Sequence, residues 1–165
     1  WGLSDGEAGG LTKKCLGGRL RIMPRKKRVL IVDDEAGMLT LLRAIFKKEK
    51  FDVLECRTAD SALELLEHET VNLVVSDIQM PGMSGLEFLD EVRKWDMDLP
   101  VIFVTGKVSD DTDWAVAIQS SCSALIEKPF KKETLMKAVR QALSNNRGPS
   151  LKGIDPTEIS EFLEI

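Results

Sequence analysis

Five polar residues that are far apart in the sequence could act together on a phosphoryl group. Asp33, Asp34, Asp77, Thr105 and Lys128 each lie at or just beyond the end of a short, strand-like apolar run. Carboxylates held close together repel one another unless a cation neutralises them, and oxygen ligands favour a hard ion such as Mg²⁺. A lysine and a hydroxyl beside them would complete a receptor for phosphoryl oxygens, and an Asp there could act as a nucleophile and become an acyl phosphate.

The elements that must position these residues alternate regularly along the chain. Apolar runs rich in Val, Ile and Leu predict five strands, at residues 29–32, 51–55, 73–76, 101–104 and 124–127. Apolar residues at helical spacing predict a helix after each strand, near residues 38–48, 58–66, 84–94, 111–120 and 135–143. Thr58 is a predicted N-cap, and Ser84 with Glu87 forms a predicted capping box. Helix phase predicts that Met38, Leu41, Leu42 and Ile45 face the core.

Alternation of strand and helix predicts an α/β fold, a doubly wound parallel sheet with helices on both faces. The carboxyl ends of parallel strands meet at one edge of such a sheet, where ligands of open α/β sheets bind. The five polar residues should therefore line one cleft.

Four separated motifs now support a resemblance to a known family. They are Asp33-Asp34, Asp77-x-x-Met80-Pro81-x-x-x-Gly85, Thr105 and Lys128-Pro129-Phe130. In order and spacing the chain resembles the receiver domain of two-component response regulators (CheY-like), over about residues 27–145. The resemblance implies a flavodoxin-like fold with five strands in the order 2-1-3-4-5.

The resemblance also implies a function and a role for each site residue. Asp77 would be the phosphoacceptor, taking a phosphoryl group from a sensor histidine kinase or a phosphotransfer protein. Mg²⁺ would be held by Asp33, Asp34, Asp77 and the backbone carbonyl of Gln79. Lys128 and Thr105 would bind phosphoryl oxygens. The protein would be a signalling regulator that assists its own phosphorylation and dephosphorylation rather than an enzyme.

The segment before Lys128 departs from the family pattern. Ser121 and Cys122 stand where the family has a Gly-Ala turn, and Leu125 replaces an aromatic residue that normally moves with the threonine. The family's switch acts through the face of helix four, strand five and helix five. No phosphoryl or metal ligand is lost, so these changes affect output rather than phosphorylation.

Two other classes remain as alternatives. A pseudo-receiver that is not phosphorylated would work as an interaction module, which the missing aromatic allows. A phosphatase of the haloacid dehalogenase type also uses Asp, Mg²⁺, Thr and Lys, but requires Asp-x-Asp after its first strand. Here the residue two after Asp77 is Gln79, so this alternative is the weaker one.

Composition divides the chain into three parts. Residues 1–28 carry eight Lys or Arg and two acidic residues, residues 29–147 carry 14 and 21, and residues 148–165 carry one and four. We expect a basic, Gly-rich, disordered arm at residues 1–26 that need not be native, a receiver at residues 27–147, and a linker with a short amphipathic helix at residues 148–165.

Charge and composition also limit the partners and the compartment. The acidic body argues against direct binding of nucleic acid, and no run is apolar enough to enter a membrane. Three unpaired cysteines favour a reducing, cytoplasmic setting, and bacterial origin follows from the resemblance. The sequence does not fix the oligomeric state; the candidate surfaces for a homodimer are the face of helix four, strand five and helix five and the C-terminal helix.

Overall fold

A five-stranded parallel sheet forms the body of the protein. The computed structural model describes residues 11–16, 19–24, 26–94, 96–106 and 123–144. The sheet strands are β3 (Arg28–Val32), β4 (Asp52–Cys56), β5 (Leu73–Ser76), β6 (Val101–Thr105) and β7 (Ala124–Glu127). They lie in the order β4-β3-β5-β6-β7. Counted along the chain this is 2-1-3-4-5, so the predicted flavodoxin-like fold is confirmed.

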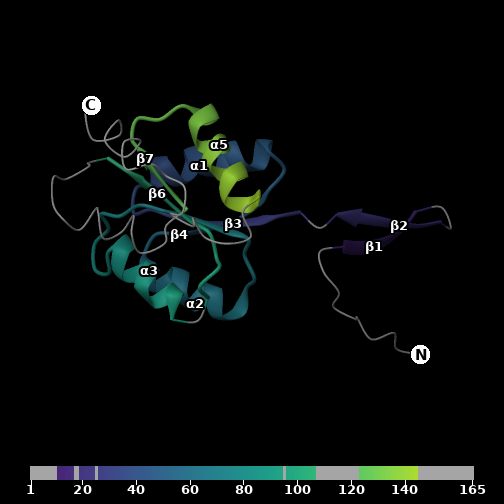
Figure 1. Ribbon diagram of the computed structural model, residues 1–165, viewed down its shortest axis with the longest axis horizontal. Helices are drawn as coiled ribbons and strands as arrows, with labels where there is room; N and C mark the ends of the chain where they lie inside the picture. The colour runs from purple at the N-terminus through teal and green to yellow at the C-terminus, as the bar shows by residue number, and fades with distance from the viewer. Residues whose placement is uncertain (1–10, 17–18, 25, 95, 107–122, 145–165) are drawn as a thin grey trace.

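Helices cover both faces of the sheet, as the alternation predicted (Figure 1). The described helices are α1 (Ala36–Lys48), α2 (Ala59–His68), α3 (Gly85–Arg93) and α5 (Lys132–Ser144). The ribbon shows α1 and α5 on one side of the sheet and α2 and α3 on the other. Each predicted N-cap is formed: Thr58 Oγ1 accepts the Ser61 N–H, and Ser84 and Glu87 make a full capping box.

Alternate residues of each strand divide the core into two clusters. On β3, Val29 and Ile31 pack with α1 and α5, whereas Leu30 and Val32 pack with α2 and α3. Side chains of a strand point alternately to its two faces, so a continuous apolar run can fill both clusters. All four residues are fully buried. The sheet is therefore a rigid base for the loops at its edges.

The predicted inward face of α1 was partly wrong. Leu41 is 47% exposed, whereas Leu39 and Phe46 are buried together with Leu42. Six apolar residues lie within residues 38–42 and 45–46, so two different stripes at helical spacing can be drawn through them. Packing of Leu39 and Phe46 against β3 and β5 selects one stripe, and spacing alone could not.

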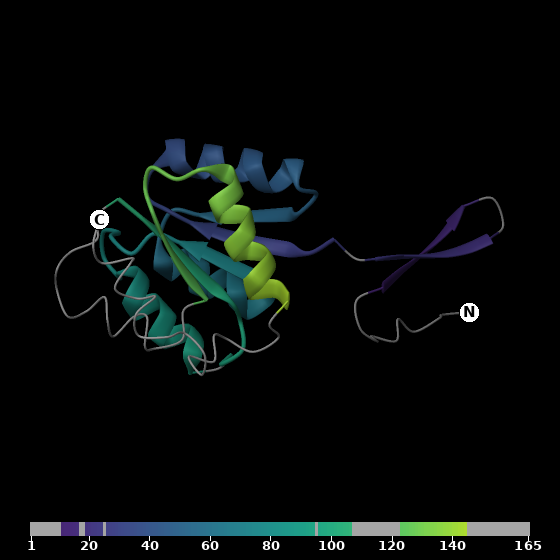
Figure 2. The same ribbon diagram turned by 45° about the horizontal axis from the view of Figure 1, so that its top comes forward.

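An antiparallel hairpin precedes the body, where the sequence predicted a disordered arm. Strand β1 (Leu11–Leu16) pairs with β2 (Arg19–Pro24), and Leu16 lies opposite Arg19. Figure 2 shows the hairpin apart from the five-stranded sheet. The sequence between the strands is Gly17-Gly18, and a Gly-Gly pair between two strand-like segments is a hairpin signal. The basic charge and the glycines had masked that signal.

Two predicted helices lie outside the described residues. One is near residues 111–120, and the other is the C-terminal amphipathic helix after residue 154. Across the described ranges, every helix is too short or too polar to cross a lipid bilayer.

Candidate functional site

The two central strands bring Asp33 and Asp77 to one edge of the sheet. Hydrogen bonding continues one residue beyond each strand: the Asp33 N–H donates to the Cys56 carbonyl at 3.2 Å, and the Asp77 N–H donates to the Val32 carbonyl at 2.9 Å. The backbones of both Asp residues are therefore fixed by the sheet. Their side chains are buried, with 1% of Asp33 and 6% of Asp77 exposed.

The neighbouring pair of strands brings Thr105 and Lys128 to the same edge. Thr105 is the last residue of β6 and is fully buried, and it lies opposite Glu127 in the ladder with β7. The Lys128 N–H donates to the Thr105 carbonyl at 2.6 Å. The Lys128–Pro129 peptide bond is cis. The predicted meeting of these residues at the carboxyl edge is thus found in the structure.

The Lys128 side chain joins the two buried carboxylates. Its ammonium nitrogen donates to Asp33 Oδ2 at 2.9 Å and to Asp77 Oδ2 at 2.8 Å. Only 12% of the Lys128 side chain is exposed. Ion pairs removed from water in this way are stable only when their remaining oxygens are also hydrogen bonded.

Backbone amides supply those hydrogen bonds. Asp33 Oδ1 accepts the Glu35 N–H at 2.8 Å, and Asp77 Oδ1 accepts the Gln79 N–H at 3.0 Å. In each carboxylate, therefore, one oxygen accepts a hydrogen bond from Lys128 and the other accepts one from a backbone N–H of the loop that follows the strand. This arrangement fixes the orientation of both side chains.

Burial and charge act in opposite directions at this site. Burial raises the pKa of Asp33, and the hydrogen bonds from Lys128 and the Glu35 N–H cancel only part of that rise. Burial on its own would lower the pKa of Lys128, but hydrogen bonds and charge attraction from Asp77 and Asp33 outweigh it, so the pKa is raised. Lys128 is therefore favoured in its charged form, while burial makes the ionised form of Asp33 less favourable than it is in water.

A third carboxylate that the sequence had not indicated joins the pair. Asp33, Glu35 and Asp77 each offer an oxygen within 4.8 Å of the others. Glu35 is exposed and precedes the first residue of α1. Its position at a loop-to-helix junction decides where its side chain lies, and no sequence pattern reports that.

Asp34 does not belong to this group of three among the described residues. It is half-buried, and its backbone carbonyl accepts a hydrogen bond from Arg57 Nη2 at 2.8 Å. Leu125, the predicted departure from the family pattern, is half-buried on β7 and packs against the cluster beneath α2 and α3. Ser121 and Cys122 lie outside the described residues.

Comparison with known families now adds to this geometry. A family model described as response regulator receiver domain matches residues 29–140. A CheY-like receiver domain protein from Methanospirillum hungatei is 31% identical and has a TM-score of 0.69, with 73% of this chain and 96% of that chain covered. The response regulator TrrA from Thermotoga maritima, solved in complex with Mg²⁺ and BeF, is 29% identical with a TM-score of 0.64, covering 71% and 99%.

Curated relatives are similar over the same region. The DNA-binding response regulator MtrA of Mycobacterium tuberculosis is 31% identical over 121 residues, which cover 73% of this chain and 52% of MtrA. The transcriptional regulatory protein GlrR of Escherichia coli is 32% identical over 118 residues, covering 72% and 26%. The chain thus spans about half of MtrA and about a quarter of GlrR.

Proposed function

Because this chain belongs to the response regulator receiver family, the phosphoacceptor domains of two-component signalling, we propose that Asp77 is its phosphoacceptor. The chain is thus a signalling regulator and not a conventional enzyme. Both alternatives, the pseudo-receiver and the dehalogenase-type phosphatase, are disfavoured by the family match. The single observation that carries the assignment of Asp77 is its buried carboxylate, hydrogen bonded to Lys128 at 2.8 Å.

The donor atoms at the site fit Mg²⁺. Three carboxylates and one lysine carry a net charge of −2 when all are ionised, which a divalent cation balances. All candidate ligands offer oxygen, the donor that Mg²⁺ prefers. We propose that Asp33, Asp34, Asp77 and the Gln79 carbonyl form the ligand set, as the family resemblance implies, with Glu35 as an added negative charge.

Phosphoryl transfer then requires little covalent chemistry from the protein. One Asp77 oxygen forms a bond to phosphorus as the P–N bond of a phosphohistidine breaks, and the imidazole nitrogen keeps the electron pair and takes a proton. Bound Mg²⁺ would neutralise charge on the phosphoryl oxygens. The Lys128 ammonium is already hydrogen bonded to Asp77, and it would donate to a phosphoryl oxygen after transfer. The Thr105 hydroxyl would donate to a second phosphoryl oxygen.

Partners follow from this chemistry. The donor would be a cytoplasmic histidine kinase or a phosphotransfer protein, and the proposed switch surface includes β7 and α5. The relatives MtrA and GlrR are named as a DNA-binding and a transcriptional regulator, and we propose that phosphorylation of this chain likewise serves the control of transcription. The receiver itself would span residues 27–147 and would not bind nucleic acid.

Intact mass after incubation with acetyl phosphate tests the proposal. Wild-type protein should gain one phosphoryl group with Mg²⁺ and none with excess chelator. Asp77→Asn should gain none under either condition, and Asp90→Asn, on the exposed side of α3, is the matched control that should gain one. Equal labelling of Asp77→Asn and wild type would refute the assignment.

A further inference from the structure

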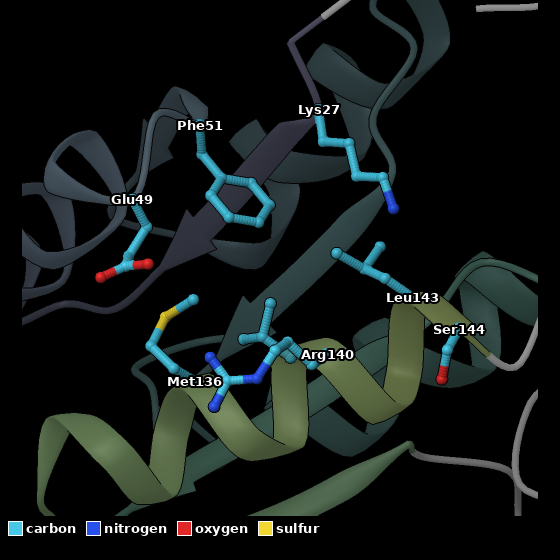
Figure 3. Close-up of a pocket in the computed structure, with 8 residues that line it drawn as sticks. Lys27, Glu49, Phe51, Met136, Arg140, Leu143 and Ser144 are labelled. Carbon is cyan, nitrogen blue, oxygen red and sulfur yellow. The ribbon is translucent and has the colours of Figure 1, made fainter. Parts of the chain in front are cut away.

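A hollow of about 300 Å³ lies at the edge of the sheet opposite to the acidic site. Lys27 directly precedes β3 and Phe51 directly precedes β4, so both mark the amino ends of their strands. Figure 3 shows Phe51 and Glu49 facing the helix α5 across the hollow. The residues that line it are Lys27, Glu49, Phe51, Met136, Val139, Arg140, Leu143 and Ser144.

The floor of this pocket is apolar. Met136 and Val139 are buried in the cluster beneath α1 and α5, and Phe51 and Leu143 are half-buried at its margin. The Phe51 ring meets the Phe46 ring edge-on at a centroid distance of 5.4 Å, which fixes its orientation. The pocket can therefore bind apolar side chains without any rearrangement of the five-stranded body.

The rim of the pocket is positively charged. Lys27 and Arg140 are exposed and form no ion pair within the described residues. The Glu49 carboxylate is paired with the Lys132 ammonium at 2.6 Å and is also attracted by Arg140. The cations Lys27, Arg140 and Lys132 outnumber this one carboxylate, so the rim keeps a net positive charge. The best occupant combines apolar side chains with negative charge.

Residues 154–165 of this chain have that composition. Ile159, Phe162 and Leu163 recur at helical spacing. Four acidic residues and a single basic one lie in residues 148–165. A short helix of this kind is marginal alone and gains most of its stability from packing.

The tail can also reach the pocket. Ser144 lines the pocket and is the last residue of α5, so the chain leaves the body at the pocket itself. The nine residues 145–153 can span at most roughly 30 Å, and Gly148-Pro149 within them favours a turn. We propose that residues 154–165 fold back and seat Ile159, Phe162 and Leu163 in this pocket, with the acidic residues on the cationic rim.

Amide chemical shifts of the full chain test this proposal. Phe162→Ser should shift the amides of pocket residues such as Phe51, Arg140 and Leu143, and should leave Gln79 at the acidic site unchanged. Its matched control is Met97→Ser, because Met97 is 63% exposed and is not part of the pocket. Pocket amides that do not respond to Phe162→Ser would overturn the proposal.

Thermal unfolding gives an independent measurement. Phe162→Ser should lower Tm by about 2–4 °C in the wild-type background. In the Leu143→Ser background the same substitution should have no further effect, since the contact is already lost. If Phe162→Ser lowered Tm equally in the two backgrounds, the tail would not contact Leu143, and the proposed docking in this pocket would be wrong.

Charge and concentration complete the test. Arg140→Glu should release the tail, and adding Glu158→Lys with Glu161→Lys should restore the pocket shifts. Failure to restore them would overturn the charge pairing. The shifts should be the same after tenfold dilution, and a loss on dilution would mean that the tail occupies a second copy instead.

Discussion

Gly85 lies against the backbone of Asp77 so closely that no side chain fits between them. A Cβ atom on Gly85 would come within 2.2 Å of the Asp77 carbonyl oxygen and 2.8 Å of the Ile78 Cα. The Gly85 N–H also donates to the Ile78 carbonyl at 2.9 Å. The first turn of α3 is thus packed directly on the loop that carries the proposed phosphoacceptor.

Gly85→Ala should move this loop. The atoms in the way belong to the backbone and cannot rotate aside, so α3 or the Asp77 loop must shift, which should destabilise the fold by about 1–3 kcal/mol. Mg²⁺ affinity and acetyl phosphate labelling should fall as well. Chemical denaturation and calorimetric titration with Mg²⁺ measure both effects.

Gly37→Ala is the control for that substitution. A Cβ on Gly37 meets nothing within 4 Å, and Gly37 lies in α1. Alanine is favoured over glycine in a helix by about 0.5–1 kcal/mol, so stability should rise slightly. If Gly85→Ala behaved like Gly37→Ala, the close packing on Asp77 would be contradicted.

Lys128→Met should leave two buried carboxylates without a cation. Breaking a buried pair by removing one partner typically destabilises by about 3–5 kcal/mol. Mg²⁺ should recover part of that loss because it supplies positive charge to the same carboxylates. Lys132→Met removes a more exposed ion pair, with Glu49, and should change the free energy of unfolding far less than Lys128→Met does. Equal losses in both variants would contradict this account.

Metal titrations can separate the contributions of Glu35 and Asp34. Glu35 offers an oxygen to the carboxylate group, whereas Asp34 is implied by the family pattern. We expect Asp34→Asn and Glu35→Gln each to weaken Mg²⁺ binding by roughly 10-fold or more. Glu91→Gln on α3 should leave affinity unchanged. If Glu35→Gln bound Mg²⁺ with wild-type affinity, Glu35 would not contribute, and the metal site would consist only of the residues that the sequence predicted.

The capping box of α3 should make stability depend on pH. The Ser84 backbone N–H and hydroxyl both donate to Glu87 Oε2 at 2.8 Å, and these hydrogen bonds lower the pKa of Glu87. A carboxyl with a lower pKa in the folded state contributes stability above its unfolded pKa, about 4.3, and that stability is lost as the pH falls through the folded value.

Glu87→Gln isolates this effect, because glutamine can still cap the helix without a charge. The slope of unfolding free energy against pH below about pH 4.3 should be smaller in this variant than in wild type. Glu67→Gln on the exposed face of α2 should keep the wild-type slope. An unchanged slope in Glu87→Gln would contradict the assigned hydrogen bonds.

Local sequence patterns were sufficient for most of the fold. The buried runs that became β3 and β5 are apolar on both faces, and Ser84 with Glu87 gave a start signal for α3 that the structure contains. The sequence did not determine which side of α1 faces the core, because Leu39 and Leu41 belong to two different apolar stripes of the same segment. The hairpin of β1 and β2 was missed because its charges resemble those of a solvated arm.

The parts of the site that follow from the order of the strands could be predicted from the sequence. The parts that depend on the exact position of a side chain could not. Strand ends placed Asp33, Asp77 and Lys128 together, and the structure confirms that they meet. That Glu35 joins them depends on its exact rotamer at the start of α1. The contact between Gly85 and Asp77 depends on the approach of a helix to a loop, and sequence spacing does not report such distances.

Trapping the acyl phosphate chemically tests the central claim most directly. The protein is incubated with acetyl phosphate and Mg²⁺ and then reduced with borohydride, which converts a phosphorylated aspartate to homoserine, and peptides are sequenced by mass spectrometry. The account predicts homoserine at position 77 only, and none when Mg²⁺ is withheld. Homoserine at position 33 or 34 with an unmodified Asp77 would contradict it.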